Sequence, residues 1–160
     1  MSEVWHQKPI RVQYKDTDQM GVVHHGNYII WFEVGRTEWM RHFGMAYHRL
    51  EEAGVLLPVT DVNISYRKSA RFDDCISIFT KIKKYSPVRL EFAYEARKIS
   101  EEDFNQSTED YAAAPFGELL AKGTTTHMWV NQEWKPVRLN KANPDVYAIV
   151  QNNCKLPDEK

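Results

Sequence analysis

Apolar residues change their spacing along the chain, from helical intervals to strict alternation. From Tyr28 to Phe43, large apolar side chains recur at helical spacing and charged residues fall mostly between them. This pattern predicts a helix with one heavily buried face. Asn27 is expected at its N-cap and Gly44 at its C-terminal cap. Gly35 is expected to let the middle of the helix approach a neighbouring surface closely.

Alternation with a period of two follows the helix. It is clearest where one face carries Val88, Leu90, Phe92, Tyr94 and Ala96 and the other carries Arg89, Glu91, Glu95 and Arg97. The same alternation, typical of half-buried antiparallel strands, occurs in 62–66 and 76–82. A further strand is expected over 119–130, and a short one over 10–14, before the helix.

Two segments fall outside these patterns. The acidic stretch 100–118 joins two predicted strands, although hairpin connections usually have about two to five residues. It is expected to be a mobile loop or an extended hairpin rather than a core element. Residues 1–140 are expected to form one domain, because the chain has the size of a single ordinary core. Residues 141–160 are expected to be a polar tail in which 146–150 could form a short helix.

One long helix and a run of antiparallel strands predict the α+β class, with a sheet wrapped around or packed against the helix. A single helix covers only one face of such a sheet, and an edge strand exposes unpaired backbone groups. Pairing with a second copy of the chain would satisfy both. The pattern therefore predicts a homo-oligomer.

Composition gives no bulk support for a nucleic-acid or membrane partner, although it leaves a local basic patch open. The 21 Lys and Arg residues balance 22 Asp and Glu residues, and a pI of about 6.6 gives no bulk attraction to nucleic acid or anionic membrane. No run of about 18 apolar residues could span a bilayer, and the first residues do not resemble a signal peptide. Cys75 and Cys154 lie far apart and are expected to be free thiols. The expected location is the cytoplasm.

The chemistry concentrates in 16-DTDQMGVVHHGNYIIWFE-33, at the start of the helix. A helix N-terminus has unpaired amides and partial positive charge, so amides between His25 and Ile29 could stabilise a carbonyl oxygen that becomes negative during acyl transfer. Asp18 could face the same carbonyl as a nucleophile or as a general base for water. Local composition alone favours turn chemistry for Asp16 and Asp18 over a reaction site, because Asp side chains commonly bond nearby backbone.

His24 and His25 do not predict a metal site. Adjacent side chains are expected to diverge, and no third or fourth ligand stands at a recognised spacing. No metal or organic cofactor is expected.

The segment 12-VQYKDTDQMGVVHHGNYIIWFEVGRTEWMR-41 resembles the opening signature of hotdog-fold acyl-CoA thioesterases of the 4-hydroxybenzoyl-CoA and Tol-Pal-associated types. The matching residues, in order, are Tyr14, Asp16, Asp18, Gly21, Val22, Val23, His25, Asn27, Tyr28, Glu33, Arg36 and Glu38. A weaker match, 62-VNISYRKSARFDDCISI-78, resembles the strand, turn and strand of the same family. Together with the strands, the resemblance covers about residues 8–135.

The resemblance implies an antiparallel hotdog sheet around one long helix, in dimers or homotetramers with active sites between subunits. It implies that Asp18 is catalytic, that the His25 amide polarises the carbonyl with some help from its side chain, and that Asp16 is structural. The substrate-binding residues it suggests are Tyr14, Val23 and Tyr28 near the acyl group. Arg71, Lys84 and Arg89 are suggested for the CoA phosphates by charge and loop position.

The expected activity is hydrolysis of an acyl-CoA thioester to a free acid and CoA. Three alternatives stay open: an acyl-carrier-protein thioesterase, a hotdog dehydratase or hydratase using His25 and Glu33, and a hotdog subunit that binds acyl-CoA without turnover. The chain departs from the family pattern in two places. It has His24 where the family has Tyr, and the connection 100–118 is longer than usual.

Overall fold

The computed structural model describes residues 4–106 and 110–154. Its elements, in chain order, are β1 (Trp5–Arg11), the 3-10 turn η1 (Tyr14–Asp16), α1 (Asn27–His42), α2 (Tyr47–Glu52), β2 (Val59–Tyr66), β3 (Cys75–Tyr85), β4 (Arg89–Lys98), α3 (Glu101–Gln106), β5 (Tyr111–Ala112), β6 (Glu118–Met128), α4 (Leu139–Ala142) and α5 (Pro144–Asn152).

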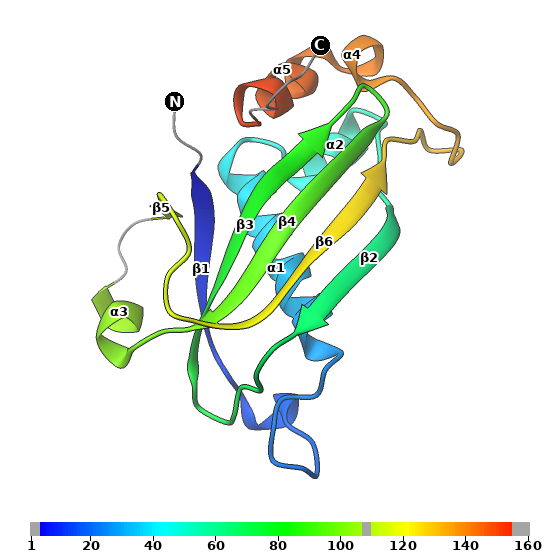
Figure 1. The fold of residues 1–160 in the computed structure, drawn as a ribbon. Coiled ribbons are helices and arrows are strands. Elements are labelled where there is room, and N and C mark those ends of the chain that lie inside the picture. The colour runs from blue at the N-terminus through cyan, green and yellow to red at the C-terminus, as the bar shows by residue number, and fades with distance from the viewer. Residues whose placement is uncertain (1–3, 107–109, 155–160) are drawn as a thin grey trace.

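The sheet is antiparallel, with strand order β2-β6-β4-β3-β1-β5, and it curves around α1 (Figure 1). This confirms the predicted α+β class and hotdog architecture. The helix approaches the sheet closely at Gly35: a Cβ atom there would lie 2.5 Å from Thr80 Oγ1 and 2.8 Å from Ile78 Cγ2. Only glycine fits such a contact without displacing β3, so the predicted role of Gly35 is confirmed.

The predicted C-terminal cap of α1 is correct, and its predicted N-cap is wrong. Gly44 follows the helix with a φ of +82°, a conformation that favours glycine, as expected. The N-cap prediction was wrong, because Gly26 occupies that position and Asn27 is the first helical residue. The Asn27 side chain is used elsewhere: its Nδ2 donates to the carbonyl oxygen of Asp16 at 2.8 Å.

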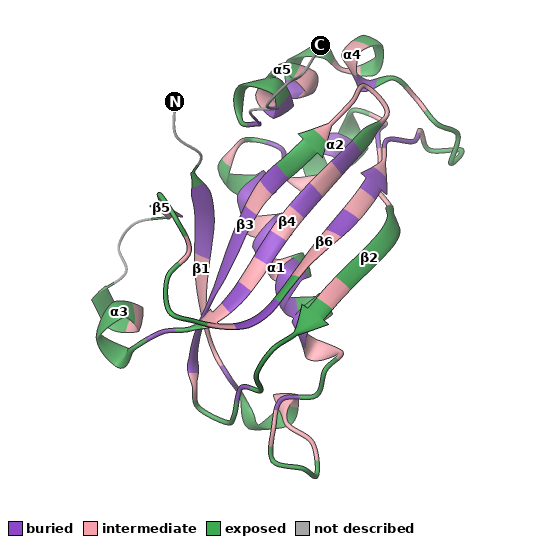
Figure 2. Cartoon of the chain, viewed as in Figure 1, coloured by how far each residue is buried: buried purple, intermediate pink, exposed green. Residues whose placement is uncertain are grey.

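Burial along the strands depends on position in the sheet (Figure 2). In β4 the residues alternate between buried and partly buried, as predicted. The first six residues of β3 are all buried, because α1 covers one face and segments such as Phe116, whose ring lies 5.2 Å from that of Phe79, cover the other. The edge strand β2 is largely exposed. Strand β1 begins and ends earlier than 10–14, because it pairs with β3 from His6 to Arg11.

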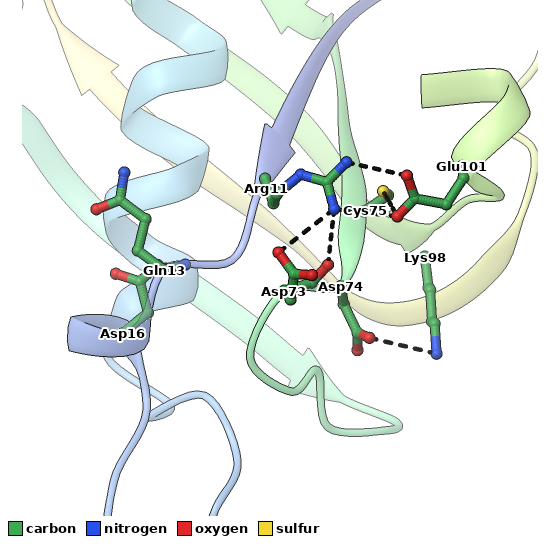
Figure 3. Close-up of polar contacts among 8 residues, drawn as sticks. All are labelled: Arg11, Gln13, Asp16, Asp73, Asp74, Cys75, Lys98 and Glu101. Atoms are coloured by element: carbon green, nitrogen blue, oxygen red, sulfur yellow. Dashed lines mark hydrogen bonds and ion pairs between the residues drawn. The ribbon is translucent and has the colours of Figure 1, made fainter. Parts of the chain in front are cut away.

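The connection 100–118 carries two short elements. Strand β5 pairs with β1 at the sheet edge, while α3 contains no buried residue. Figure 3 shows how α3 is attached: Arg11 donates to both carboxylate oxygens of Glu101 at 3.0 and 3.1 Å, and Cys75 Sγ donates to Glu101 Oε2 at 3.2 Å. Residues 107–109, within the same predicted loop, lie outside the described part of the chain.

The segment after residue 140 is more than a polar tail. Helix α5 contains the expected short helix, and Val146 and Val150 on it are buried together with Cys154. Cys154 Sγ lies 3.8 Å from the carbonyl oxygen of Ile82 on β3. The helix thus packs onto the end of the sheet (Figure 1). Among the described helices, none has the length and apolarity that a bilayer span would need.

Candidate active site

Asp16 organises the loop that precedes α1. Its Oδ2 accepts a hydrogen bond from the Gln13 amide at 2.9 Å and so closes the turn η1. Its carbonyl oxygen accepts from the His24 amide at 2.9 Å and from the Asn27 side chain. Asp16 therefore ties the loop to the first turn of the helix, which fits the structural role suggested for it.

Asp18 begins a tight turn that ends at Val22. The Asp18 amide donates to the Val22 carbonyl at 2.9 Å, and the turn is made at Gly21, whose φ is +80°. Asp18 Oδ1 accepts from the Met20 amide at 2.9 Å. Turn chemistry thus uses one carboxylate oxygen, while Oδ2 has no hydrogen-bond partner within 4–106 and 110–154. This half-buried carboxylate keeps one oxygen for a ligand.

The His25 amide lies immediately before the positive end of α1. The neighbouring amides are engaged: His24 donates to Asp16, and Gly26 donates to His24 Nδ1 at 3.0 Å. The amide of His25 itself donates no hydrogen bond in the described part of the chain. A free amide at a helix N-terminus is a suitable donor for a developing oxyanion.

The two histidine rings do not diverge as expected. The rings of His24 and His25 stack, with centroids 4.2 Å apart and an interplanar angle of 26°. The Gly26 amide holds His24 Nδ1, which turns that ring back over the helix start. Within the described ranges, no group of three or more His, Cys, Asp or Glu side chains could hold a metal ion.

A cleft of about 310 Å³ brings these groups together. Its lining consists of Asp18, Met20, Val22, Val23, His25, Tyr28, Tyr66, Arg67, Lys68 and Ser69. Tyr28 forms its buried wall, where its hydroxyl accepts from the Ala70 amide at 3.1 Å. Burial raises the pKa of Tyr28, so this hydroxyl stays neutral at physiological pH. Of the predicted residues, the cleft therefore contains Asp18, Val23, His25 and Tyr28.

Two cations lie at the cleft, on the turn between β2 and β3. Lys68 is paired with Glu118, with Nζ 2.7 Å from Oε2; this hydrogen bond raises the pKa of Lys68 and lowers that of Glu118. The Arg67 guanidinium makes no ion pair or side-chain hydrogen bond within the described residues. Arg67 is thus the cation that an anionic ligand could reach without breaking an existing pair.

The other four predicted binding residues do not line this cleft. Tyr14 is 78% exposed and packs edge-on against Phe72, with ring centroids 5.8 Å apart. Arg71 lies in the same turn as Arg67, but its amide donates to Asp74 and its side chain stays outside the lining. The register of the sheet places Lys84 and Arg89 away from the cleft as well.

Lys84 and Arg89 lie at the opposite end of the sheet from the cleft. Tyr66 pairs with Ala121 on β6, whereas Arg89 pairs near the other end of that strand, with Met128. Lys84 pairs with Glu91, and its Nζ lies 3.7 Å from Glu91 Oε1. Charge and loop position did not reveal which end of each strand faces the site, so both residues fall outside the cleft within one chain.

The sequence pattern did not indicate four of the residues that line the cleft: Tyr66, Arg67, Lys68 and Ser69. A signal was present, because Tyr66 continues the alternation of Val62 and Ile64 and so faces the helix. What the sequence could not reveal is that the end of β2 reaches the loop before α1. Together, a carboxylate with a free oxygen, a free helix-end amide and an unpaired guanidinium can bind an anionic ester and attack its carbonyl carbon.

Comparison with known proteins gives one family and several close relatives. The model of the thioesterase-like superfamily matches residues 12–152. A Bacillus subtilis protein, putative acyl-CoA thioesterase YneP, is 38% identical over 145 residues, which cover 90% of this chain and 94% of that protein. Acyl-CoA thioester hydrolase YbgC of Escherichia coli is 37% identical over 84 residues, or 52% of this chain and 63% of that protein. The crystal structure of a DHNA-CoA thioesterase from Staphylococcus aureus is 31% identical, with a TM-score of 0.78 over 92% of this chain and 89% of that one.

Proposed function

The chain belongs to the thioesterase-like superfamily, and from this premise we propose that it hydrolyses acyl-CoA thioesters in the cleft at the start of α1. The observation that carries this proposal is that one cleft contains both Asp18, which has an unbonded carboxylate oxygen, and His25, whose amide is unbonded in the described structure. The names of the relatives support acyl-CoA as the substrate class.

The reaction needs a site for negative charge and a group that supplies or activates the nucleophile. The thioester carbonyl oxygen would lie against the His25 amide, where the helix end stabilises the charge that develops on it. Asp18 Oδ2 either takes a proton from the attacking water or attacks the carbonyl carbon itself. The tetrahedral intermediate then collapses and the C–S bond breaks; the departing CoA thiolate takes up the proton that Asp18 removed from water or, where Asp18 is the nucleophile, a proton from solvent. If Asp18 is the nucleophile, water afterwards hydrolyses the acyl-aspartate anhydride.

Arg67 is the residue that we assign to the CoA phosphates. Its guanidinium is unpaired in the described structure and lies at the rim of the cleft, so it could bind phosphate oxygens without losing another partner. Lys68 contributes positive charge nearby but is already held by Glu118. Val23 and Tyr28, which form the apolar side of the cleft, would face the acyl group.

We also propose that the working form is a homo-oligomer, at least a dimer. Strand β2 is the exposed edge of the sheet and carries Val59, Val62 and Tyr66, each 44 to 46% exposed. The cleft opens beside this edge, so a second copy that pairs with β2 would also cover the cleft. Cys75 and Cys154 are buried and form no disulfide within the described residues, which suits a reducing compartment and supports a location in the cytoplasm.

The test is the substitution Asp18→Asn, which removes the charge but keeps an oxygen that can accept from the Met20 amide. We expect kcat for an acyl-CoA to fall by about 10²- to 10⁴-fold, with the melting temperature close to that of the wild type. Asp16→Asn is the matched control: Asp16 binds His24 and Asn27 through its backbone oxygen, and an Asn oxygen can still accept from the Gln13 amide, so the change should act on loop stability and leave kcat near the wild-type value. Free thiol release is the readout.

Running the assay on matched acyl-CoA and acyl-carrier-protein substrates decides between the two thioesterase activities. A faster rate on the carrier protein would transfer the proposal to that substrate. A well-folded Asp18→Asn protein with wild-type kcat would remove Asp18 from the mechanism. Ligand binding without any turnover by the wild type would instead identify a non-catalytic acyl-CoA-binding subunit.

A further inference from the structure

Tyr66 joins the edge of the sheet to the loop before α1. It is the last residue of β2, and its hydroxyl donates to the carbonyl oxygen of His25 at 2.9 Å. The two residues are 41 positions apart in the sequence. This hydrogen bond therefore fixes the loop before α1 to a strand that is distant from it in the sequence.

The backbone around His25 is held on both sides, while its own amide stays free. Asp16 holds the His24 amide, and the His24 ring holds the Gly26 amide. Tyr66 holds the His25 carbonyl oxygen at 2.9 Å, and the Tyr28 amide donates to the same oxygen at a longer 3.4 Å. The hydroxyl thus restrains the residue whose amide we assign to the oxyanion, through its carbonyl oxygen and not through the amide itself.

The Tyr66 ring is itself held in place. It packs edge-on against Tyr28, with centroids 5.5 Å apart at 80°, and against the His25 ring at 6.3 Å and 90°. Tyr28 in turn accepts from the amide of Ala70, in the turn between β2 and β3. The residue is 46% exposed, but these two edge-on contacts restrain its ring, so packing as well as the hydrogen bond sets the position of its hydroxyl.

We propose that Tyr66 is a positioning residue for thioester hydrolysis: its hydroxyl holds the His25 carbonyl oxygen and so restrains the His25 backbone, whose amide we assign to the developing oxyanion. This inference rests on the proposed function and deepens it. Donors of this kind stabilise the transition state only if they are oriented before the reaction, because reorientation during the reaction would cost part of the gain. The hydroxyl affects the transition state and not the binding of CoA, which Arg67 governs at the rim.

The substitution Tyr66→Phe tests this, because it keeps the packed ring and removes only the hydroxyl. Loss of a whole oxyanion donor typically costs about 10²- to 10³-fold in kcat; loosening a donor should cost a part of that, so we expect kcat to fall roughly 10-fold. KM and the melting temperature should stay near their wild-type values. Tyr85→Phe is the matched control, since Tyr85 also packs against a tyrosine ring, at the far end of β3, and it should retain wild-type kcat.

Each result has one meaning when Asp18→Asn is measured beside Tyr66→Phe. A wild-type kcat for Tyr66→Phe, together with an inactive Asp18→Asn, would overturn the role of Tyr66 and leave the proposed function standing. A rise in KM at unchanged kcat, or a loss of kcat matched by a lower melting temperature, would also overturn it, since Tyr66 would then act in binding or in folding. Wild-type kcat in Asp18→Asn would overturn the proposed site and the role of Tyr66 with it.

Discussion

At the scale of single residues, a buried chain of hydrogen bonds runs between α1 and the sheet. Arg36 donates to the Tyr94 hydroxyl at 3.1 Å, and the Tyr94 and Thr125 hydroxyls lie 2.6 Å apart. Thr125 Oγ1 is 2.8 Å from His127 Nε2, while His127 Nδ1 faces the carbonyl oxygen of Leu57. A carbonyl oxygen can only accept, so Nδ1 carries the proton and Nε2 accepts from Thr125. The chain of donors is therefore consistent with a neutral His127.

Protonation of His127 is costly in the folded protein. Burial, and then the positive charge of Arg36, lower its pKa from 6.5 to about 4. Below pH 6.5 the unfolded chain takes up this proton while the folded protein does not, so stability falls as the pH falls toward 4. At 1.36 kcal/mol for each unit, the loss from this residue between pH 7 and pH 5 is roughly 2 kcal/mol.

We predict that His127→Gln has a shallower dependence of stability on pH than the wild type. The substitution removes the titrating group, so its unfolding free energy should fall by roughly 2 kcal/mol less between pH 7 and pH 5. Urea unfolding followed by circular dichroism at both pH values measures this difference. His48→Gln, an exposed position on α2, should keep the wild-type dependence. Equal slopes in all three proteins would contradict the assignment.

At the scale of elements, α3 is an attachment to the sheet rather than a part of its core. Its polar contacts to β1 and β3 run through Glu101, which binds Arg11 and accepts from Cys75 (Figure 3). The Arg11 guanidinium also lies 4.8 Å from the Phe104 ring centre. Burial first, and then the hydrogen bond to Glu101, raise the pKa of the Cys75 thiol. The helix therefore keeps this thiol both covered and protonated.

We predict that Glu101→Ala makes Cys75 more reactive. Removing the carboxylate releases α3 from β1 and takes away a group that raises the thiol pKa, so a larger thiolate fraction meets solvent. In a Cys154→Ser background, the rate of labelling by a thiol reagent at pH 8 should rise several-fold. Glu102→Ala, on the same helix, should leave the rate unchanged. Labelling of Glu101→Ala at the wild-type rate would show that α3 does not protect the thiol.

At the scale of the whole molecule, the two edges of the sheet differ in whether another strand pairs with them. The β1 edge is partly covered by β5, which pairs at Trp5 and His6. The β2 edge has no partner strand among the described residues, and Val62 on it is 45% exposed. Exposed apolar side chains on an unpaired edge favour association with another strand. The proposed homo-oligomer would therefore form through β2.

We predict that the wild type is at least a dimer at micromolar concentration and that Val62→Lys dissociates it. A lysine at the centre of the β2 edge would lose its hydration on pairing, and a penalty of 1.4 kcal/mol already weakens association tenfold. Turnover should fall in parallel with dissociation. Val4→Lys is the control, because Val4 is 50% exposed but precedes the opposite side of the sheet. Sedimentation with activity measurements tests this, and a fully active monomer would contradict it.

The sequence by itself determined the long helix and the main strands, and it indicated the segment in which we propose the site. Helical spacing placed α1 within one residue at each end, and alternation placed β4, because a half-buried helix or strand must repeat its apolar residues with its own period. Asp18 and His25, the residues of the proposed site, could be proposed from the sequence because both are local to the start of one helix. Gly35 indicated a close contact of the helix with a neighbouring surface, and the structure identifies that surface as β3.

Only the tertiary structure decided which distant segments meet. Tyr66 and Arg67 reach the cleft because β2 ends beside the loop before α1, whereas Lys84 and Arg89 lie at the other end of the same sheet. Periodicity specifies which face of a strand a residue occupies but says nothing about which end of the sheet it reaches. That end is fixed by strand order and register, which depend on packing between residues far apart in the chain.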